Sequence, residues 1–401
     1  MTTERPTTEQ PTTEQPTTER LVTERLVTER LVTTDRLTVH HAEVEGRTGE
    51  PVVLVHGNVS SGAFWHPTMT ALPDRYRPLA PDLRGFGRTE PLPVDATRGL
   101  RDHSEDLLSY LRALALGPVH LVGWSMGGGV ALQLLRDRPE LVRTLTLVNP
   151  VSPYGFGGTH GVDGRLNSPD GAGSGAGGAA PEFVRLLGEG ETGSGSPFAP
   201  LSVLNTAYVS EPLPDPDRYL AAMLTTRTGE DHYPGDSRPS GAWPGFRPGD
   251  RGVLNSMAPT HFRIDDLESV EPKPPVLWIR GTADVIVSDT SLFDLAHLGA
   301  IGAVPGWPGA DTCPAQPMVA QTRAVLDRYA AAGGRVREVT VEGAGHSVQV
   351  ERPEEFLTAL VEVLGGGGGG GRRGGGPPPT PRGGGGRPAP RGGGGAAAAP
   401  R

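Results

Sequence analysis

A serine between two glycines is the residue of this 401-residue chain with the clearest capacity for chemistry. Ser125 lies in the sequence GWSMG, with the apolar run VHLV before it and a helical pattern after it. A sharp strand-to-helix turn would strain the serine backbone and expose its hydroxyl, so its close neighbours must lack a Cβ atom. Gly123 and Gly127 meet this need. The pattern predicts a nucleophilic serine at the end of a buried strand.

Two further side chains have the types that would activate such a serine. A serine hydroxyl needs a general base to act as a nucleophile at neutral pH. His346, in the sequence GAGH, follows the last predicted strand and can accept and return a proton. Asp284 follows another predicted strand and can orient the histidine. Asp289 lies five residues further on and is the alternative orienting acid.

Strands that alternate with helices must position these side chains. A continuous apolar run, typical of a strand buried on both faces of a parallel sheet, occurs at 51–55, and further strands are predicted at 119–122, 141–148 and 274–280. Helical spacing of apolar residues separates them, for example at 98–116. This alternation predicts an α/β fold of βαβ units with right-handed crossovers. Since each candidate residue directly follows a strand, all three are expected at the carboxyl edge of the sheet.

Four motifs in this order resemble those of the α/β-hydrolase-fold superfamily of serine hydrolases, of the capped bacterial type. They are HGN at 56–58, DLRGFG at 82–87, GWSMGG at 123–128 and GAGH at 343–346. The chain order of Ser125, Asp284 and His346 is also that of the superfamily. The resemblance covers about residues 37–364 and is weakest between 150 and 266. It implies a mostly parallel central sheet flanked by helices, an inserted cap and a Ser-His-Asp triad.

The same resemblance implies an oxyanion hole of two backbone N–H groups. In the superfamily one belongs to the residue after the nucleophile, here Met126, and one to the loop after HG, here Asn58. Trp124 and His56 are candidates for the substrate pocket, with a core position and support of the oxyanion loop as their alternatives. HGN and DLRG also resemble haloalkane dehalogenases and epoxide hydrolases, but those relatives attack with an aspartate where this chain has Ser125.

Other polar residues near the motifs are expected to be structural. Asp82 and Arg84 are predicted to brace loops. Asp102, His103 and Glu105 have the types of metal ligands, but they lie at a helix start, where polar residues are common caps. We therefore predict no metal and no cofactor.

Composition divides the chain into five predicted segments. These are a disordered Thr/Glu/Arg repeat arm at 1–34, core halves at 35–150 and 267–364, a cap insertion at 151–266, and a disordered Gly/Pro/Arg-rich tail at 365–401. The repeat units PTTEQ and LVTER contain no aromatic residue and build no continuous apolar helical stripe. Residues 151–266 are rich in Gly, Pro, Ser and Asp, and so long a segment is typical of a functional insertion.

Charge and cysteine content restrict the partners. The chain has a formal net charge of −9, and its tail carries six arginines and no acid, so the folded part is strongly acidic. This argues against nucleic acid as the partner of the domain. Cys313 is the single cysteine, which excludes an intrachain disulfide. With no signal-peptide pattern and no apolar run of about 18 residues, we expect a cytoplasmic protein without a membrane partner.

The predicted function is hydrolysis of an ester, a lactone or a related small carbonyl substrate through an acyl-enzyme. The same triad could instead serve C–C bond hydrolysis, perhydrolase or haloperoxidase-like chemistry, or an aminopeptidase. A non-catalytic ligand-binding homologue is the alternative of another class, and the complete motifs argue against it. The arginine-rich tail also leaves open an RNA- or surface-associated role, although it lacks aromatic residues for stacking on bases.

Overall fold

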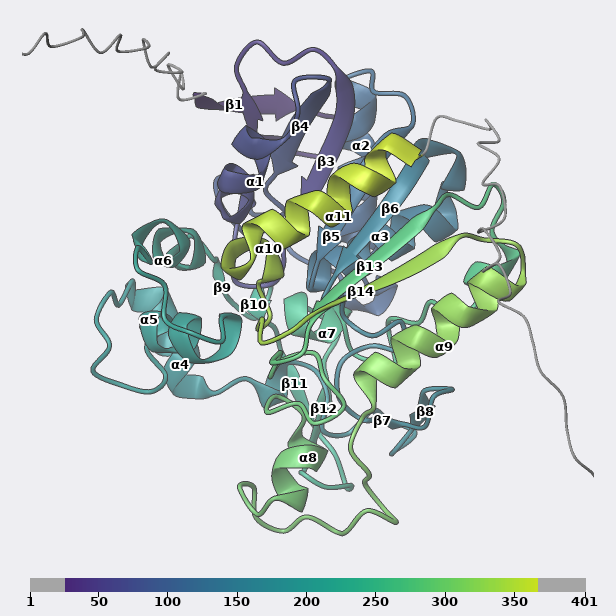
Figure 1. Ribbon diagram of the computed structural model, residues 1–401. Coiled ribbons are helices and arrows are strands. Elements are labelled where there is room, and N and C mark those ends of the chain that lie inside the picture. The colour runs from purple at the N-terminus through teal and green to yellow at the C-terminus, as the bar shows by residue number, and fades with distance from the viewer. Residues whose placement is uncertain (1–25, 367–401) are drawn as a thin grey trace, which may run out of the picture. The chain divides into compact units, whose positions relative to one another are not determined.

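A mostly parallel eight-stranded sheet organises residues 26–366, the part of the chain that this computed structural model describes. The strand order is β1-β2-β4-β3-β5-β6-β13-β14 (Figure 1). The strands are β1 (Val27–Thr33), β2 (Thr38–Val44), β3 (Glu50–Val55), β4 (Tyr76–Pro81), β5 (Val119–Trp124), β6 (Val142–Val148), β13 (Val276–Gly281) and β14 (Val336–Val341). The six strands from β4 to β14 run parallel, and β1 and β2 add an antiparallel edge.

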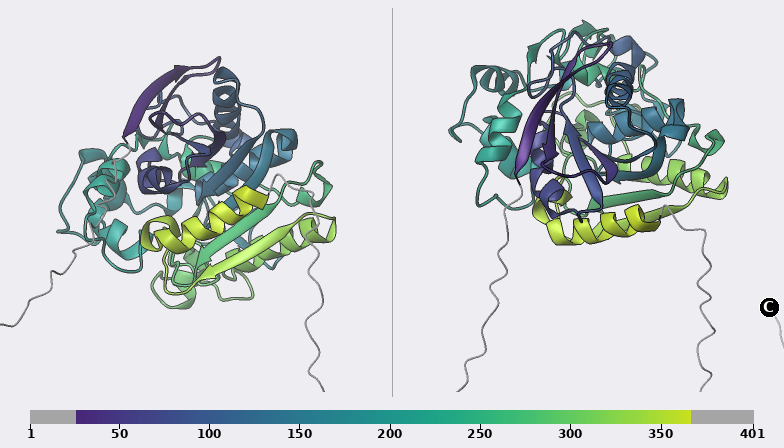
Figure 2. Two further views of the ribbon diagram at one scale, coloured as in Figure 1. Left: turned by 45° about the horizontal axis from the view of Figure 1, so that its top comes forward. Right: turned by 90° about the horizontal axis from the view of Figure 1, so that it is seen from above.

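Helices cover both faces of the sheet, because its central strands are apolar on both sides. Val53 and Leu121 face one hydrophobic core with helices α2 (Arg101–Ala113), α3 (Met126–Asp137) and α9 (Met318–Ala331). Val52 and Val122 face the other core with α1 (His66–Ala71) and α11 (Pro353–Gly366) (Figure 2). Four-residue α10 (Val348–Glu351) precedes α11, and α8 (Leu295–Ala300) follows β13. This arrangement confirms the predicted α/β architecture. Among residues 26–366, no helix is both long and apolar enough to cross a membrane.

The chain between β6 and β13 adds no strand to the main sheet. It contains the helices α4 (Pro181–Glu189), α5 (Pro200–Val203), α6 (Asp217–Leu224) and α7 (Val253–Ser256) and a π-helical turn, η5 (Leu204–Tyr208). Three small strand pairs accompany them: β7 (Thr159–His160) with β8 (Arg165–Leu166), β9 (Thr228–Gly229) with β10 (Tyr233–Pro234), and β11 (Ser237–Pro239) with β12 (Phe246–Pro248). The predicted insertion is therefore made of short elements, and its function as a cap stays a prediction.

The predicted disorder of residues 1–34 is wrong for 27–33, which form β1. This strand pairs with all seven residues of β2, and Val27 and Val32 pack against the two cores. Glu29 pairs with Arg88, and Arg30 pairs with Glu43. At the other end, α11 runs to Gly366, two residues into the predicted tail. The remaining predictions for the arm and the tail lie outside the described residues.

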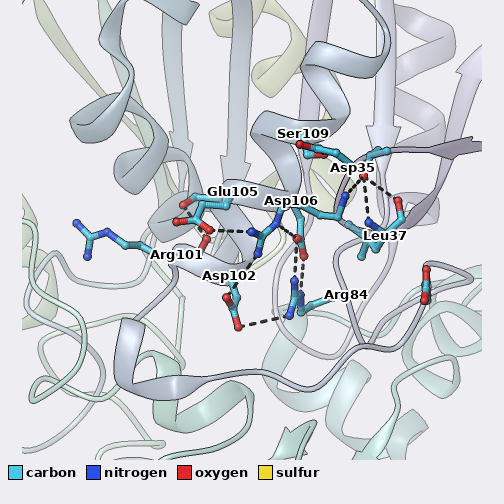
Figure 3. Close-up of polar contacts among 12 residues, drawn as sticks. Asp35, Leu37, Arg84, Arg101, Asp102, Glu105, Asp106 and Ser109 are labelled. Atoms are coloured by element: carbon cyan, nitrogen blue, oxygen red, sulfur yellow. Dashed lines mark hydrogen bonds and ion pairs between the residues drawn. The ribbon is translucent and has the colours of Figure 1, made fainter.

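A cluster of ion pairs fixes the DLRG loop to the start of α2 (Figure 3). The Arg84 guanidinium donates to both carboxylate oxygens of Asp106, at 2.5 and 2.8 Å, and also donates to the Pro93 carbonyl at 2.7 Å. Asp82 accepts from the backbone N–H groups of Gly62 and Arg88. These contacts confirm that Asp82 and Arg84 brace loops. Among the described residues, no group of His, Cys, Asp and Glu side chains could hold a metal ion.

His103 lies in α2 with a fully buried ring, and neither ring nitrogen has a hydrogen-bond partner among the described residues. Burial, together with the positive charge of Arg84, lowers the pKa of His103 to about 4. An unfolded histidine titrates near its ordinary pKa of about 6.5. The unfolded chain therefore binds more protons than the folded chain between these two values, and stability must fall as pH falls from about 6.5 to 4.

We expect the stability of His103→Leu to depend less steeply on pH between about 6.5 and 4 than that of the wild type. The free energy of unfolding of the wild type should drop by up to about 1.4 kcal/mol per pH unit more than that of the variant over this range. Urea titrations at pH 4.5, 5.5, 6.5 and 7.5 measure the difference. At pH 7.5 the histidine is neutral in both states, so its titration contributes nothing there. Parallel curves at all four values would contradict the prediction.

The sequence of β1, VTERLVT, also occurs one repeat earlier, at residues 22–28. Deletion of residues 26–30 restores the same seven residues directly before Thr34, so β1 should form unchanged. We expect the melting temperature to stay within about 1 °C of the wild type. Deletion of residues 27–30 is the matched control, because it puts arginine in the place of Glu29 and leucine in the place of Arg30. Since both ion pairs are then lost and threonine takes the place of Val27, which packs against a core, the melting temperature should fall by about 2 °C or more, and an equal loss in both deletions would contradict the prediction.

Candidate active site

Ser125 occupies a strained turn between β5 and α3. Its backbone φ of 56° and ψ of −121° lie outside the regions that a serine ordinarily adopts. The Ser125 N–H donates to the Val148 carbonyl at 2.9 Å, and its own carbonyl accepts from Gly128 and Val151. Cβ atoms at Gly123 and Gly127 would lie only 2.3 and 2.4 Å from backbone oxygens, so both positions require glycine. The predicted strained elbow is therefore present.

His346 and Asp284 meet at the carboxyl edge of the sheet. The Nδ1 atom of His346 lies 2.9 Å from Oδ2 of Asp284, and both side chains are buried. Asp284 Oδ1 accepts from the backbone N–H groups of Ile286 and Val287, at 2.8 and 3.0 Å. Since Asp284 Oδ1 accepts from two backbone N–H groups and Oδ2 faces the ring, Nδ1 of His346 is the natural donor to Oδ2, which leaves Nε2 as an acceptor.

Asp289, the alternative acid, has a different task. Its Oδ1 atom accepts from the backbone N–H groups of Val319 and Ala320 in the first turn of α9. This is the contact of a helix-capping carboxylate, which offsets unpaired N–H groups and the positive end of the helix dipole. The geometry therefore pairs His346 with Asp284.

Trp124 and Asn149 hold the histidine loop. Trp124 Nε1 donates to the His346 carbonyl at 2.8 Å, and the indole is fully buried. The Asn149 side chain donates to the carbonyls of Gly345 and His346, at 3.0 and 2.7 Å, and accepts from the Gly281 N–H at 3.0 Å. One asparagine after β6 thus ties the histidine loop to the end of β13, which leads to Asp284.

The oxyanion loop after β3 lies against the elbow. A Cβ atom on Gly57 would be 2.9 Å from the Ser125 Cβ. Within residues 26–366, the backbone N–H groups of Asn58 and Met126 have no hydrogen-bond acceptor. In the same range the Ser125 hydroxyl has no hydrogen-bond partner. His56 supports this loop: its Nε2 accepts from the Leu83 N–H at 2.9 Å, and its Nδ1 lies 2.8 Å from the Gly57 carbonyl.

Burial lowers the pKa of His56, so the ring stays neutral between its two backbone partners. The alternative of a structural histidine is therefore supported by geometry, and Trp124 likewise contacts the histidine loop from within the core. Neither side chain has exposed surface in the described structure, and a pocket role for the two residues stays a prediction.

Sequence reasoning missed Asn149, Tyr208 and Glu351, which join the loops of the site. Asn149 follows the apolar strand β6 directly, and a polar residue in that position is the signal that could have pointed to it. Glu351 lies five residues after His346 and accepts from the Gly345 N–H at 2.9 Å. No pattern distinguishes Tyr208 from other residues of the insertion.

Comparisons with known proteins agree with this fold. Residues 50–179 match the family described as "alpha/beta hydrolase fold". Two solved structures share the fold, each with a TM-score of 0.53. The esterase (EaEST) from Exiguobacterium antarcticum is 16% identical, over 84% of this chain and 98% of that one. The carboxylesterase CesB (YbfK) from Bacillus subtilis is 17% identical, over 85% of this chain and 92% of that one. The fold is thus that of the α/β hydrolases, and residues 50–179 match the family of that description.

Curated relatives are similar over a shorter stretch. The chain is 40% identical to the "Putative carbamate hydrolase RutD" of Variovorax paradoxus over 135 residues, which cover 33% of this chain and 50% of that protein. It is 33% identical to the "(E)-2-((N-methylformamido)methylene)succinate hydrolase" of Acinetobacter baylyi over 114 residues, 28% of this chain and 42% of that protein. The chain therefore spans half or less of the length of these relatives, and Asp284 and His346 lie beyond the family match at residues 50–179.

We expect Asn149→Asp to loosen the histidine loop. The substitution keeps the shape but replaces the donating amide nitrogen with an oxygen that faces two carbonyl groups. Leaving these buried acceptors unpaired should lower the free energy of unfolding by about 1–3 kcal/mol. Hydrogen exchange of the peptide covering residues 343–351 should accelerate. Asn167→Asp is the matched control: it removes a similar bond, to the Pro314 carbonyl, and should leave exchange at 343–351 unchanged. Wild-type exchange in Asn149→Asp would contradict the prediction.

Proposed function

We propose that the protein is a serine hydrolase that cleaves an ester, a lactone or a related small carbonyl compound through an acyl-enzyme. The observation that carries the proposal is the convergence of three features at one sheet edge. They are the strained Ser125 elbow, the Asp284–His346 hydrogen bond, and the unpaired N–H groups of Asn58 and Met126 beside the elbow. This combination provides a nucleophile, a base with its orienting acid, and two donors for an oxyanion.

Each residue would have one role in the reaction. His346 Nε2 takes the Ser125 proton as the serine oxygen attacks the substrate carbonyl. The Asn58 and Met126 N–H groups stabilise the negative charge that forms on the carbonyl oxygen. Asp284 keeps the imidazole in the required tautomer and stabilises its protonated form. His346 then protonates the leaving group, and water attacks the acyl-enzyme with the same base.

Hydrolysis of a carbamate or an N-acyl substrate is the second candidate within this mechanism. It is favoured by the names of the two curated relatives, both of which are described as hydrolases of such compounds. The triad serves either leaving group, because His346 can protonate an alkoxide or an amine. Substrate choice would then depend on the insertion between β6 and β13, where the resemblance is weakest.

Covalent labelling by a fluorophosphonate probe tests the proposal. The wild type should be labelled at Ser125 and should hydrolyse p-nitrophenyl acetate, whereas folded Ser125→Ala and His346→Ala should do neither. Rates with p-nitrophenyl acetate and with an aryl carbamate of the same leaving group would separate the two candidates. A folded wild type that is neither labelled nor active would favour the non-catalytic binding protein.

The two aspartates give a matched pair of variants. Asp284→Asn should lower kcat by about 10⁴-fold, because an amide favours the wrong tautomer of the histidine. Asp289→Asn should keep kcat within about twofold and lower the free energy of unfolding by about 1 kcal/mol, because it weakens the cap of α9. The reverse ranking in kcat would assign the acid to Asp289.

A further inference from the structure

The side chain of Tyr208 connects the insertion to the candidate site. This residue ends the π-helical turn η5 (Leu204–Tyr208), a rare conformation that is frequent at functional sites. Its ring is buried and packs edge-on against His346, with ring centroids 6.0 Å apart at 84°, and against Trp124 at 5.9 Å and 75°. Tyr208 thus packs against the candidate base, His346, and against Trp124, the neighbour of Ser125.

Two hydrogen bonds of Tyr208 reach two different loops of the site. Its hydroxyl donates to the Asn58 carbonyl at 2.8 Å, and its backbone carbonyl accepts from the Ser347 N–H at 2.9 Å. One residue of the insertion therefore bridges the oxyanion loop and the histidine loop. Because the Asn58 carbonyl is held, rotation about the Asn58 Cα–C bond is restricted. The Asn58 N–H belongs to the preceding peptide plane, whose Gly57 carbonyl lies 2.8 Å from His56 Nδ1, so Tyr208 acts on this N–H through the position of the Asn58 Cα atom.

The hydroxyl of Tyr208 can only act as a donor in this position. Its acceptors are main-chain carbonyls, those of Asn58 and, more distantly at 3.4 Å, Val59. Burial raises the pKa of Tyr208, so the phenol stays protonated. The hydroxyl proton therefore stays in the hydrogen bond to the Asn58 carbonyl, and the contact supports the loop after β3.

A second contact holds the next residues of the insertion in place. The Glu351 carboxylate accepts from the Ser210 N–H at 2.7 Å and, through its other oxygen, from the Gly345 N–H at 2.9 Å. Gly345 packs so closely that a Cβ atom would lie 2.8 Å from the Ser210 nitrogen. The segment 208–210 is thus fixed to the histidine loop independently of the Tyr208 hydroxyl.

We propose that Tyr208 is a positioning residue that sets the oxyanion loop relative to His346, so that the insertion controls the geometry of oxyanion stabilisation. The effect on the reaction rests on the proposed serine hydrolase function. The effect on the oxyanion loop itself does not, and can be measured separately.

Tyr208→Phe tests the proposal, because it removes only the donor to Asn58. With p-nitrophenyl acetate, kcat should fall about tenfold, equivalent to about 1.4 kcal/mol, and KM should stay within about twofold, since oxyanion stabilisation acts in the transition state. The rate of fluorophosphonate labelling should fall in parallel. Tyr219→Phe is the matched control: this tyrosine belongs to the same insertion and packs on Phe64, with ring centroids 4.9 Å apart, and it should keep wild-type kcat and labelling.

Hydrogen exchange separates the proposal from the proposed function. In Tyr208→Phe, exchange of the peptide covering residues 56–61 should accelerate while that of 343–351 stays near wild type. Glu351→Gln should give the opposite pattern, because it disturbs an acceptor of the Gly345 N–H. An inactive wild type with these exchange patterns would overturn the serine hydrolase but keep the positioning contact. Wild-type kcat and wild-type exchange at 56–61 in folded Tyr208→Phe would overturn the role of Tyr208.

Discussion

The strained backbone of Ser125 is the constraint on which the rest of the site depends. A serine at φ 56° is costly, and such a conformation persists only where the surrounding structure holds it. Here the hydrogen bond to Val148 on β6, the helix start at α3 and the close packing of Gly123 and Gly127 hold it together. Because these contacts belong to the buried centre of the sheet, they restrict movement of the elbow. Every other candidate residue is placed relative to this fixed point.

Main-chain groups, more than side-chain pairs, transmit that placement to the loops. The histidine loop is held through the carbonyls of Gly345 and His346, and the Asp284 carboxylate accepts two backbone N–H groups. Such bonds fix a loop by its backbone, so the direction of each side chain follows from the loop conformation. Asn149 connects two of these loops, since its amide group bonds both the histidine loop and the end of β13. A buried amide that uses its donor and its acceptor gives a defined geometry that an apolar residue could not provide.

Local patterns made the fold and most of the candidate site predictable, and long-range contacts account for the rest. The conformation of the apolar strands and of the turn around Ser125 depends on residues that are close together in the sequence. Asp284 and Asp289 follow the same strand, and only packing shows that one meets His346 and the other caps α9. The strand β1 is not predictable from its own sequence, because the LVTER repeat has the composition of a solvated arm. An edge strand with an exposed face shows weak alternation, and its pairing partner β2 lies beyond a turn.

The proposed role of the insertion makes substrate choice and chemistry dependent on each other. Tyr208 packs against Trp124 and His346 and donates to the Asn58 carbonyl. The segment expected to select the substrate therefore also contacts residues of the candidate site. Glu351 attaches that segment to the histidine loop from the side of α10. With the proposed function, a change of sequence in residues 204–210 would alter both substrate binding and the position of the proposed oxyanion donors. Selection for a new substrate must preserve these contacts, which restricts the variation that the insertion can accept.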